Sequence, residues 1–288
     1  MQITKAIFPV AGFGTRFLPA TKAQPKEMLP VVDKPAIQYL VEDAVSAGIK
    51  DIIFVTGRGK RAIEDHFDYS FELDKTLVEK NKLDLVEKVR RIPNLARFSY
   101  VRQAMPLGDG HAVNCASYLV EGQPVLVMFG DTLYDAPISP ARQVIEAYYR
   151  FQAPIIGLSE VDKSLVSKFG VIDGEEIEKG IFKIKRIAEK PPLDKAPSNL
   201  VAVGIYVITH PVFGVLQEMK SGHSGEIRLA DAFAIMLEQG AEIYGKKIEG
   251  EWLDTGDKFG FIKATLKLGV KDPEIGEKLK SFIKEFNN

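Results

Sequence analysis

The stretch ITKAIFPVAGFGTRFLPATKAQPKEMLP, residues 3–30, carries the features that decide the fold of this 288-residue chain. Its apolar start predicts a buried strand, and its remainder predicts a glycine-containing loop. A helix is expected from Lys34, with Pro35 in its first turn and Gly48 as its stop signal, before a strand at residues 51–56. This strand–loop–helix–strand unit predicts two parallel strands joined by a right-handed crossover.

The alternation of helix and strand patterns continues to residue 160 and then changes. Strands are expected at 98–102, 124–129 and 154–160, and helices at 61–67, 71–91, 111–119 and 140–151. The segment 71–91 is the most charged, so we expect it to project from the core. Short strands follow at 169–172, 181–191 and 200–208, with helices at 228–239, 258–270 and 273–286. We predict an α/β fold: a Rossmann-like doubly wound mixed sheet with a C-terminal helical tail.

Composition and charge exclude several classes of protein. Apolar residues make up 45% and charged residues 27%, which is typical of a globular protein. The net charge of −1 provides no overall field for nucleic acid or an anionic membrane, so neither is expected as a partner. The single cysteine, Cys115, excludes an intrachain disulfide, and four scattered histidines make a histidine metal site unfavourable. Neither a signal peptide nor a membrane-spanning run is recognised, and we predict a cytoplasmic protein.

The loop after the first strand is suited to binding phosphate. Gly12 and Gly14 let backbone amides approach phosphate oxygens, and Arg16, Lys22 and Lys26 supply positive charge. The segment lacks the third glycine of a dinucleotide fingerprint and the GK[ST] of a P-loop. A plain glycine turn with solvated basic residues is the alternative.

Charged side chains at three later positions are candidates for the same cleft. Asp131 follows an apolar strand, so it either faces the ligand crevice or caps a turn, and Asp254 has the same ambiguity. Glu189 and Lys190 should point to opposite faces of a strand, but Pro191 ends that strand and lets both reach a cleft. An exposed, ion-paired edge is the alternative for this pair.

Ordered segments along nearly the whole chain resemble the nucleotidylyltransferases that make nucleoside-diphosphate sugars. The first is PVAGFGTRFLPATKAQPKEMLPVVDKPAIQYLVEDAVSAGI, and VRQAMPLGDGHAV, FGVID, IAEKP, APSNLVAVGIYV, SGEIRLADA and WLDTGDKFGF follow in order. Within that superfamily, KEML and FDYSFELDKTL are similar to the bacterial uridylyltransferase branch. This resemblance implies UTP and glucose 1-phosphate as substrates, with UDP-glucose and pyrophosphate as products.

The resemblance also implies roles for individual residues. Nucleotide contacts are implied for Ala11, Gly12, Gly14, Thr15, Arg16, Lys26, Glu27, Gln103, Gly108 and Asp131. Contacts to the sugar phosphate are implied for Gly170, Glu189 and Lys190, and Mg²⁺ is implied as a cofactor held by Asp131 and Asp254. Arg16, Lys26, Asp131 and Lys190 are the catalytic candidates. His111 is interpreted as a packing or helix-start residue, because none of the histidines lies in a recognisable nucleophile motif.

The order of the predicted strands and helices indicates a catalytic domain, residues 1–270, and a helical tail, residues 271–288. The nucleotide half is expected at about 1–160 and the sugar-phosphate half at about 161–257. The tail places Ile275, Leu279, Phe282, Ile283 and Phe286 on one helical stripe, which favours a homodimer or homotetramer.

Substrate selectivity stays open on the sequence alone. Relatives commonly have Arg where this chain has Ile205, so we expect a charge to be missing near the sugar and hexose discrimination to be weaker. The alternatives are the same reaction with dTTP or another sugar 1-phosphate, and a catalytically silent paralogue that binds sugar nucleotides.

Overall fold

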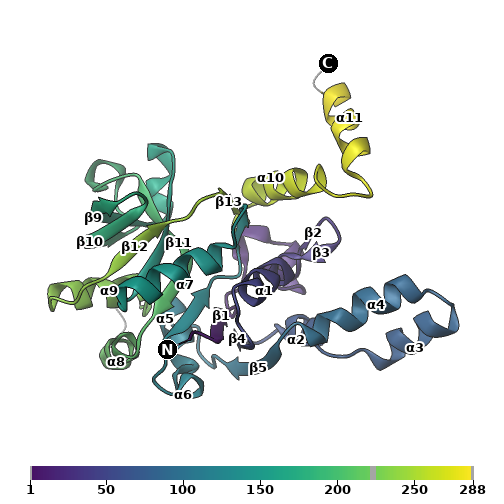
Figure 1. The fold of residues 1–288 in the computed structure, drawn as a ribbon, viewed down its shortest axis with the longest axis horizontal. Helices are drawn as coiled ribbons and strands as arrows, with labels where there is room; N and C mark the ends of the chain where they lie inside the picture. The colour runs from purple at the N-terminus through teal and green to yellow at the C-terminus, as the bar shows by residue number, and fades with distance from the viewer. Residues whose placement is uncertain (1, 221–224, 287–288) are drawn as a thin grey trace.

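A mixed sheet of nine strands forms the centre of the protein in the computed structural model, which describes residues 2–220 and 225–286 (Figure 1). The strand order is β5-β4-β1-β6-β11-β8-β12-β10-β9. The parallel part comprises β1 (Lys5–Pro9), β4 (Asp51–Thr56), β5 (Arg97–Arg102) and β6 (Val125–Met128). The remainder comprises β8 (Ile155–Glu160), β9 (Gly170–Glu178), β10 (Ile181–Glu189), β11 (Leu200–Ile208) and β12 (Tyr244–Lys247). The mixed α/β sheet predicted from the sequence is confirmed.

Helices cover both faces of this sheet and bury its apolar side chains. One face packs against α1 (Ala36–Ser46) and α7 (Pro140–Phe151). The other packs against α5 (Asp109–Cys115), α8 (His210–Glu218) and α9 (Leu229–Glu238). The two large core clusters that result lie one on each side of the sheet, as expected when the strands are apolar on both faces. The sequence did not predict α8.

Two predicted helices are interrupted. The segment expected as one helix at 71–91 forms α3 (Phe71–Glu79) and α4 (Leu83–Arg91), because Asn81 turns the chain with a positive φ of 53°. The segment expected at 111–119 divides into α5 and α6 (Ser117–Val120). The helix at 61–67 is present as α2 (Arg61–Phe67). The α3–α4 hairpin projects away from the sheet, as its charge predicts (Figure 1).

The C-terminal region contains α10 (Lys258–Gly269) and α11 (Gly276–Phe286), which extend from the opposite side of the molecule from α8 (Figure 1). The tail helix begins three residues later than predicted, because Asp272 accepts hydrogen bonds from the backbone amides of Glu274 and Ile275 in a turn before it. No helix within residues 2–220 and 225–286 is long and apolar enough to cross a membrane.

Two small ribbons were not predicted. In one, β2 (Pro30–Val31) pairs with β3 (Lys34–Pro35), so Pro35 precedes α1 instead of lying in its first turn. In the other, β7 (Thr132–Asp135) pairs with β13 (Glu251–Asp254) in antiparallel register. Because Asp254 lies opposite Thr132 in that register, the second ribbon brings Asp254 beside the end of β6.

Candidate active site

Two adjoining pockets collect most of the residues singled out from the sequence. The first, the glycine-loop pocket, is lined by Ala11, Gly12, Gly14, Thr15, Gln103, Gly108 and Asp109, among others. The second, the central pocket, is lined by Arg16, Asp109, Asp131, Gly170, Glu189, Lys190 and Asp254, among others. Asp109 lines both, so the two pockets adjoin at this residue.

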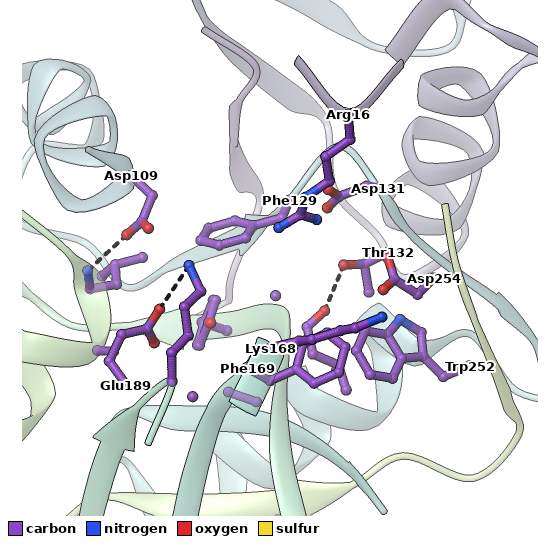
Figure 2. Close-up of a pocket in the computed structure, with 18 residues that line it drawn as sticks. Arg16, Asp109, Phe129, Asp131, Thr132, Lys168, Phe169, Glu189, Trp252 and Asp254 are labelled. Atoms are coloured by element: carbon purple, nitrogen blue, oxygen red, sulfur yellow. Dashed lines mark hydrogen bonds and ion pairs between the residues drawn. The ribbon is translucent and has the colours of Figure 1, made fainter. Parts of the chain in front are cut away.

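The central pocket has two ends of different chemistry. Figure 2 shows Arg16, Asp131 and Asp254 at one end and Asp109 and Glu189 at the other. We call the first three, with the neighbouring Lys26, the charge end. We call Asp109 and Glu189 the acid end.

The loop that shapes the glycine-loop pocket is compact. Gly14 adopts a left-handed φ of 65°, and a Cβ atom there would lie 3.1 Å from the Cβ of Lys26. The Thr21 hydroxyl donates a hydrogen bond of 2.7 Å to the Gly14 carbonyl. These contacts fold residues 15–28 into three short 3-10 turns and bring Lys26 back towards the pocket.

The far wall of the glycine-loop pocket is held by a buried amide. The Gln103 side chain donates to the Gly108 carbonyl at 2.9 Å, and its Nε2 also lies 2.9 Å from Nδ1 of His111. Gly108 has a φ of 107°, and a Cβ atom there would approach the Ile227 carbonyl to 2.4 Å. Only glycine therefore fits at this position, and His111 helps to orient Gln103 from the first turn of α5.

The charge end is formed by three segments that are far apart in the sequence. Lys26 Nζ lies 2.5 Å from Oδ2 of Asp131, and the Arg16 guanidinium donates to the Gly256 carbonyl at 3.3 Å. A Cβ atom on Gly256 would lie 2.8 Å from Oδ1 of Asp254 and 3.1 Å from Oδ2 of Asp131. The absence of a side chain at Gly256 thus lets both carboxylates and Arg16 converge.

Burial and neighbouring charges set the protonation of this end. Burial opposes ionisation of Asp131, but Lys26 and then Arg16 outweigh it and hold the pKa of Asp131 below its ordinary value. Burial, followed by repulsion from Asp131, raises the pKa of Asp254 to about 6. Burial lowers the pKa of Lys26, yet the charges of Asp131 and Glu27 outweigh it and raise that pKa overall. Asp131 and Lys26 are therefore both charged at neutral pH.

The two carboxylates at the charge end suit a hard divalent cation. Oxygen ligands are those that Mg²⁺ prefers, and a cation between Asp131 and Asp254 would relieve the repulsion that raises the pKa of Asp254. In the part of the chain that the structure describes, no group of three or more His, Cys, Asp or Glu side chains is placed to hold a metal. A cation bound here would need further oxygen ligands from phosphate or water.

Glu189 and Lys190 both reach the central pocket because the chain turns at the end of β10. Lys190 has a positive φ of 45°, and its amide donates to the Phe169 carbonyl at 3.0 Å. Its ammonium lies 3.4 Å from Oε1 of Glu189. A Cβ atom on Gly170 would lie 3.1 Å from Oε2 of Glu189, so this glycine leaves room for the carboxylate.

Two residues singled out from the sequence lie away from the pocket linings. Glu27, expected beside a nucleotide, is only 1% exposed and lies outside both pockets. Its carboxylate pairs with Lys60 Nζ at 2.8 Å. Ile205, expected near a sugar, is fully buried in the core on the α1 and α7 face of the sheet, while its neighbours Gly204 and Tyr206 line the central pocket. Side-chain alternation along β11 explains the difference.

Several pocket residues were missed by sequence analysis. They are Asp109, Phe129, Thr132, Lys168, Tyr206 and Trp252. Most of them have no sequence feature that marks a pocket residue. Tyr206, for example, belongs to a continuous apolar strand, and Phe129 ends another. Asp109 had a weak one: it is an acid directly after a loop glycine, which is also a common pattern for the start of a helix.

Comparison with known proteins shows similarity over nearly the whole chain. A family model described as "Nucleotidyl transferase" matches residues 5–270. A "UTP--glucose-1-phosphate uridylyltransferase" of Bacillus subtilis (strain 168) is 46% identical over 287 residues, which cover 100% of this chain and 98% of that protein.

Two solved structures are similar over nearly the whole chain. A UTP-bound UGPase from Acinetobacter baumannii superimposes with a TM-score of 0.91 at 39% identity, over 99% of each chain. A crystal structure of UDP-glucose pyrophosphorylase complexed with UDP-glucose superimposes with a TM-score of 0.86 at 40% identity, over 94% of this chain and 100% of that one.

The chain therefore belongs to the nucleotidyl transferase family. Within the family, its full-length similarity is to the UTP–glucose-1-phosphate uridylyltransferases. The resemblance inferred from the ordered sequence segments is confirmed.

Proposed function

We propose that this chain transfers a uridylyl group from UTP to α-D-glucose 1-phosphate and so produces UDP-glucose and pyrophosphate. The observation that carries the proposal is a pair of adjoining pockets, the central one lined by the charged side chains of Arg16, Asp131 and Lys190, in a chain that matches uridylyltransferases from end to end. One pocket suits a nucleotide, and the other suits a polyhydroxylated phosphate ester.

The chemistry requires no protein nucleophile. An oxygen of the sugar phosphate attacks the α-phosphorus of UTP in line, a new phosphorus–oxygen bond forms, and the bond to the departing pyrophosphate breaks. Because one anion attacks another, the protein must align the groups and offset their charge, and Arg16, Lys26 and Lys190 have the charge and position to do so. Mg²⁺ bound by Asp131 and Asp254 would supply further neutralisation of the phosphates.

The remaining site residues divide between the two substrates. Gln103 hydrogen-bonds the edge of uracil, Gly108 provides a flat backbone wall, and backbone amides at 11–15 meet the phosphates. Glu27 acts indirectly, because its buried pair with Lys60 fixes the turn that presents Lys26. In the central pocket, Glu189 accepts hydrogen bonds from sugar hydroxyls, Lys190 binds the sugar phosphate, and the backbone at Gly170 contacts the ring.

The division into a nucleotide half (1–160), a sugar-phosphate half (161–257) and a tail (271–288) remains part of this proposal. We also propose that the protein acts in the cytoplasm as a homodimer or homotetramer. Support for assembly comes from α10, where Phe259, Ile262 and Leu266 lie on one stripe and are 79%, 57% and 42% exposed. Continuous apolar stripes of this kind are typical of interfaces.

The direct test measures pyrophosphate and UDP-sugar formation with a matrix of nucleoside triphosphates and sugar 1-phosphates. We expect the highest kcat/KM with UTP and glucose 1-phosphate, weaker use of dTTP, and strong rejection of ATP and GTP, which need a larger base slot. A preference for dTTP, for a purine or for another hexose would overturn the assignment within the family. An absence of turnover with every pair would favour the silent sugar-nucleotide-binding alternative.

A further inference from the structure

The central pocket holds a second carboxylate at its sugar side that none of the assigned roles uses. Asp109 opens α5 and lines the pocket together with Glu189 and Tyr206. Figure 2 shows Asp109 and Glu189 on the same side, away from Arg16, Asp131 and Asp254. The two carboxylates interact electrostatically, since Glu189 raises the pKa of Asp109.

One oxygen of Asp109 has a structural partner and the other is available. Oδ1 accepts a hydrogen bond of 2.8 Å from the Leu229 amide at the start of α9. Among the described residues, no basic side chain forms an ion pair with Asp109, and the nearby Arg228 is bound to Glu226 at 2.7 Å. Burial makes the carboxylate costly to ionise and, more than any other cause, raises its pKa to about 6. A ligand that donates a hydrogen bond would offset that cost.

We infer that Asp109 is a specificity-determining residue for the sugar, accepting a hydrogen bond from one hydroxyl of the hexose while Glu189 accepts from another. This inference rests on the proposed function. Two carboxylates facing one pocket fit a polyol, because each hydroxyl is a donor and each carboxylate oxygen is an acceptor. The amide that orients Asp109 belongs to Leu229, which lines the central pocket and is absent from the residues lining the glycine-loop pocket.

The test compares wild type with Asp109→Asn, using glucose 1-phosphate and its 2-, 3-, 4- and 6-deoxy analogues. Asn keeps an oxygen to accept from the Leu229 amide and removes the charge. We expect kcat/KM for glucose 1-phosphate to fall roughly tenfold or more, as for a lost charge-assisted hydrogen bond. The KM for UTP should change less than about twofold. For the one analogue that lacks the hydroxyl contacting Asp109, the variant and wild type should become nearly equal.

Controls separate this role from a structural one. Asp65→Asn, an exposed acid on α2 that pairs with Arg61, should leave every substrate unaffected. Urea unfolding at pH 7.5 should show Asp109→Asn to be at least as stable as wild type, because burial already opposes ionisation. Asp109→Ser is a second variant, whose hydroxyl oxygen can still accept a hydrogen bond but carries no charge. Its kcat/KM should depend on the deoxy analogue in the same way as that of Asp109→Asn.

Three results would overturn the inference while leaving the uridylyltransferase activity intact. The first is an unchanged kcat/KM for glucose 1-phosphate in a folded Asp109→Asn protein. The second is an equal penalty for every deoxy analogue. The third is a selective rise in the KM for UTP, which would place Asp109 with the nucleotide. A wild-type protein that makes no UDP-glucose would instead overturn the proposed function.

Discussion

The two ends of the central pocket differ in charge: one holds charges of both signs, and the other holds two carboxylates. At the charge end, Lys26 and Arg16 balance Asp131 and hold its pKa low. At the acid end, Asp109 and Glu189 repel each other, and Lys190 is the ion-pair partner of Glu189 at 3.4 Å. The first arrangement suits a transferring phosphoryl group, which needs charges of both signs held ready. The second leaves carboxylate oxygens available, as recognition of hydroxyl groups requires.

This contrast predicts that loss of a charge has different consequences at each end. A substitution at the charge end should impair the reaction whichever sugar 1-phosphate is used. A substitution at the acid end should change which sugar is used.

Asp131→Asn should have the largest effect. It removes a carboxylate from the proposed metal site and leaves Lys26 without its partner, so kcat/KM should fall by about a hundredfold to a thousandfold. Steady-state pyrophosphate release across a Mg²⁺ titration provides the measurement. The matched control is Asp135→Asn, which alters an acid at the end of β7, four residues further along the chain, that pairs with Lys271 outside both pockets. Near-normal turnover by Asp131→Asn at low Mg²⁺ would show that the metal assignment is wrong.

Lys26→Ala and Lys190→Ala test which substrate each lysine binds, because each lysine is assigned to a different phosphate. We expect Lys26→Ala to raise mainly the KM for UTP and Lys190→Ala mainly the KM for glucose 1-phosphate. Charge-assisted contacts of about 1.5 to 3 kcal/mol correspond to roughly tenfold to hundredfold losses. If both variants weakened the same substrate equally, the assignment of the two lysines to different phosphates would be wrong.

Substitution of the buried ion pair next to Lys26 should affect the stability of the protein more than its catalysis. Lys60 and Glu27 form an ion pair whose side chains are 6% and 1% exposed, so Lys60→Met leaves a buried carboxylate unpaired. Breaking such a pair typically costs about 3 to 5 kcal/mol of unfolding free energy.

Urea unfolding measures this loss of stability. The double variant Glu27→Leu/Lys60→Met should regain most of the lost free energy of unfolding, because it leaves no unpaired charge. Arg61→Gln, at an exposed ion pair with Asp65, is the control and should change stability by less than about 1 kcal/mol. Equal stability of Lys60→Met and wild type would contradict a structural role for the pair.

The sequence predicted the charge end better than the acid end, for physical reasons. Gly14, Arg16 and Lys26 lie in one loop after a recognisable buried strand, and Asp131 follows another strand. The convergence of Asp254 with Asp131 depends on the β7–β13 ribbon, whose strands are too short to show a clear periodicity. Asp109 is recognisable as a pocket residue only once α9 packs beside α5 and the Leu229 amide binds it.

Residues adjacent in the sequence can also lie in different surroundings, which the local sequence pattern does not predict. Lys26 and Glu27 are neighbours, yet a 3-10 turn directs one to Asp131 and the other to buried Lys60. The Arg that relatives commonly have at the position of Ile205 predicts a place near the sugar, but strand alternation places Ile205 in the core on the opposite face of the sheet. Its presence therefore gives no physical reason for weaker sugar discrimination.

The tail should have the smallest effect on catalysis, because α11 contributes no residue to either pocket. Truncation after Lys271 should leave kcat/KM within about twofold and reduce the assembly measured by light scattering. Leu279 lies against Gly269 of α10, so removal of the tail also uncovers part of that helix. An unchanged oligomer in light scattering would exclude the tail from the interface.

The most direct test of the two ends of the pocket is a crystal structure of this chain with UDP-glucose. We predict that the uracil lies against Gln103 and Gly108 and that the diphosphate lies by Arg16 and Lys190. The hexose should lie between Glu189 and Asp109, with a hydroxyl within hydrogen-bond distance of each carboxylate. A hexose bound in the glycine-loop pocket, or a uracil at the acid end, would contradict the assignment of the two ends.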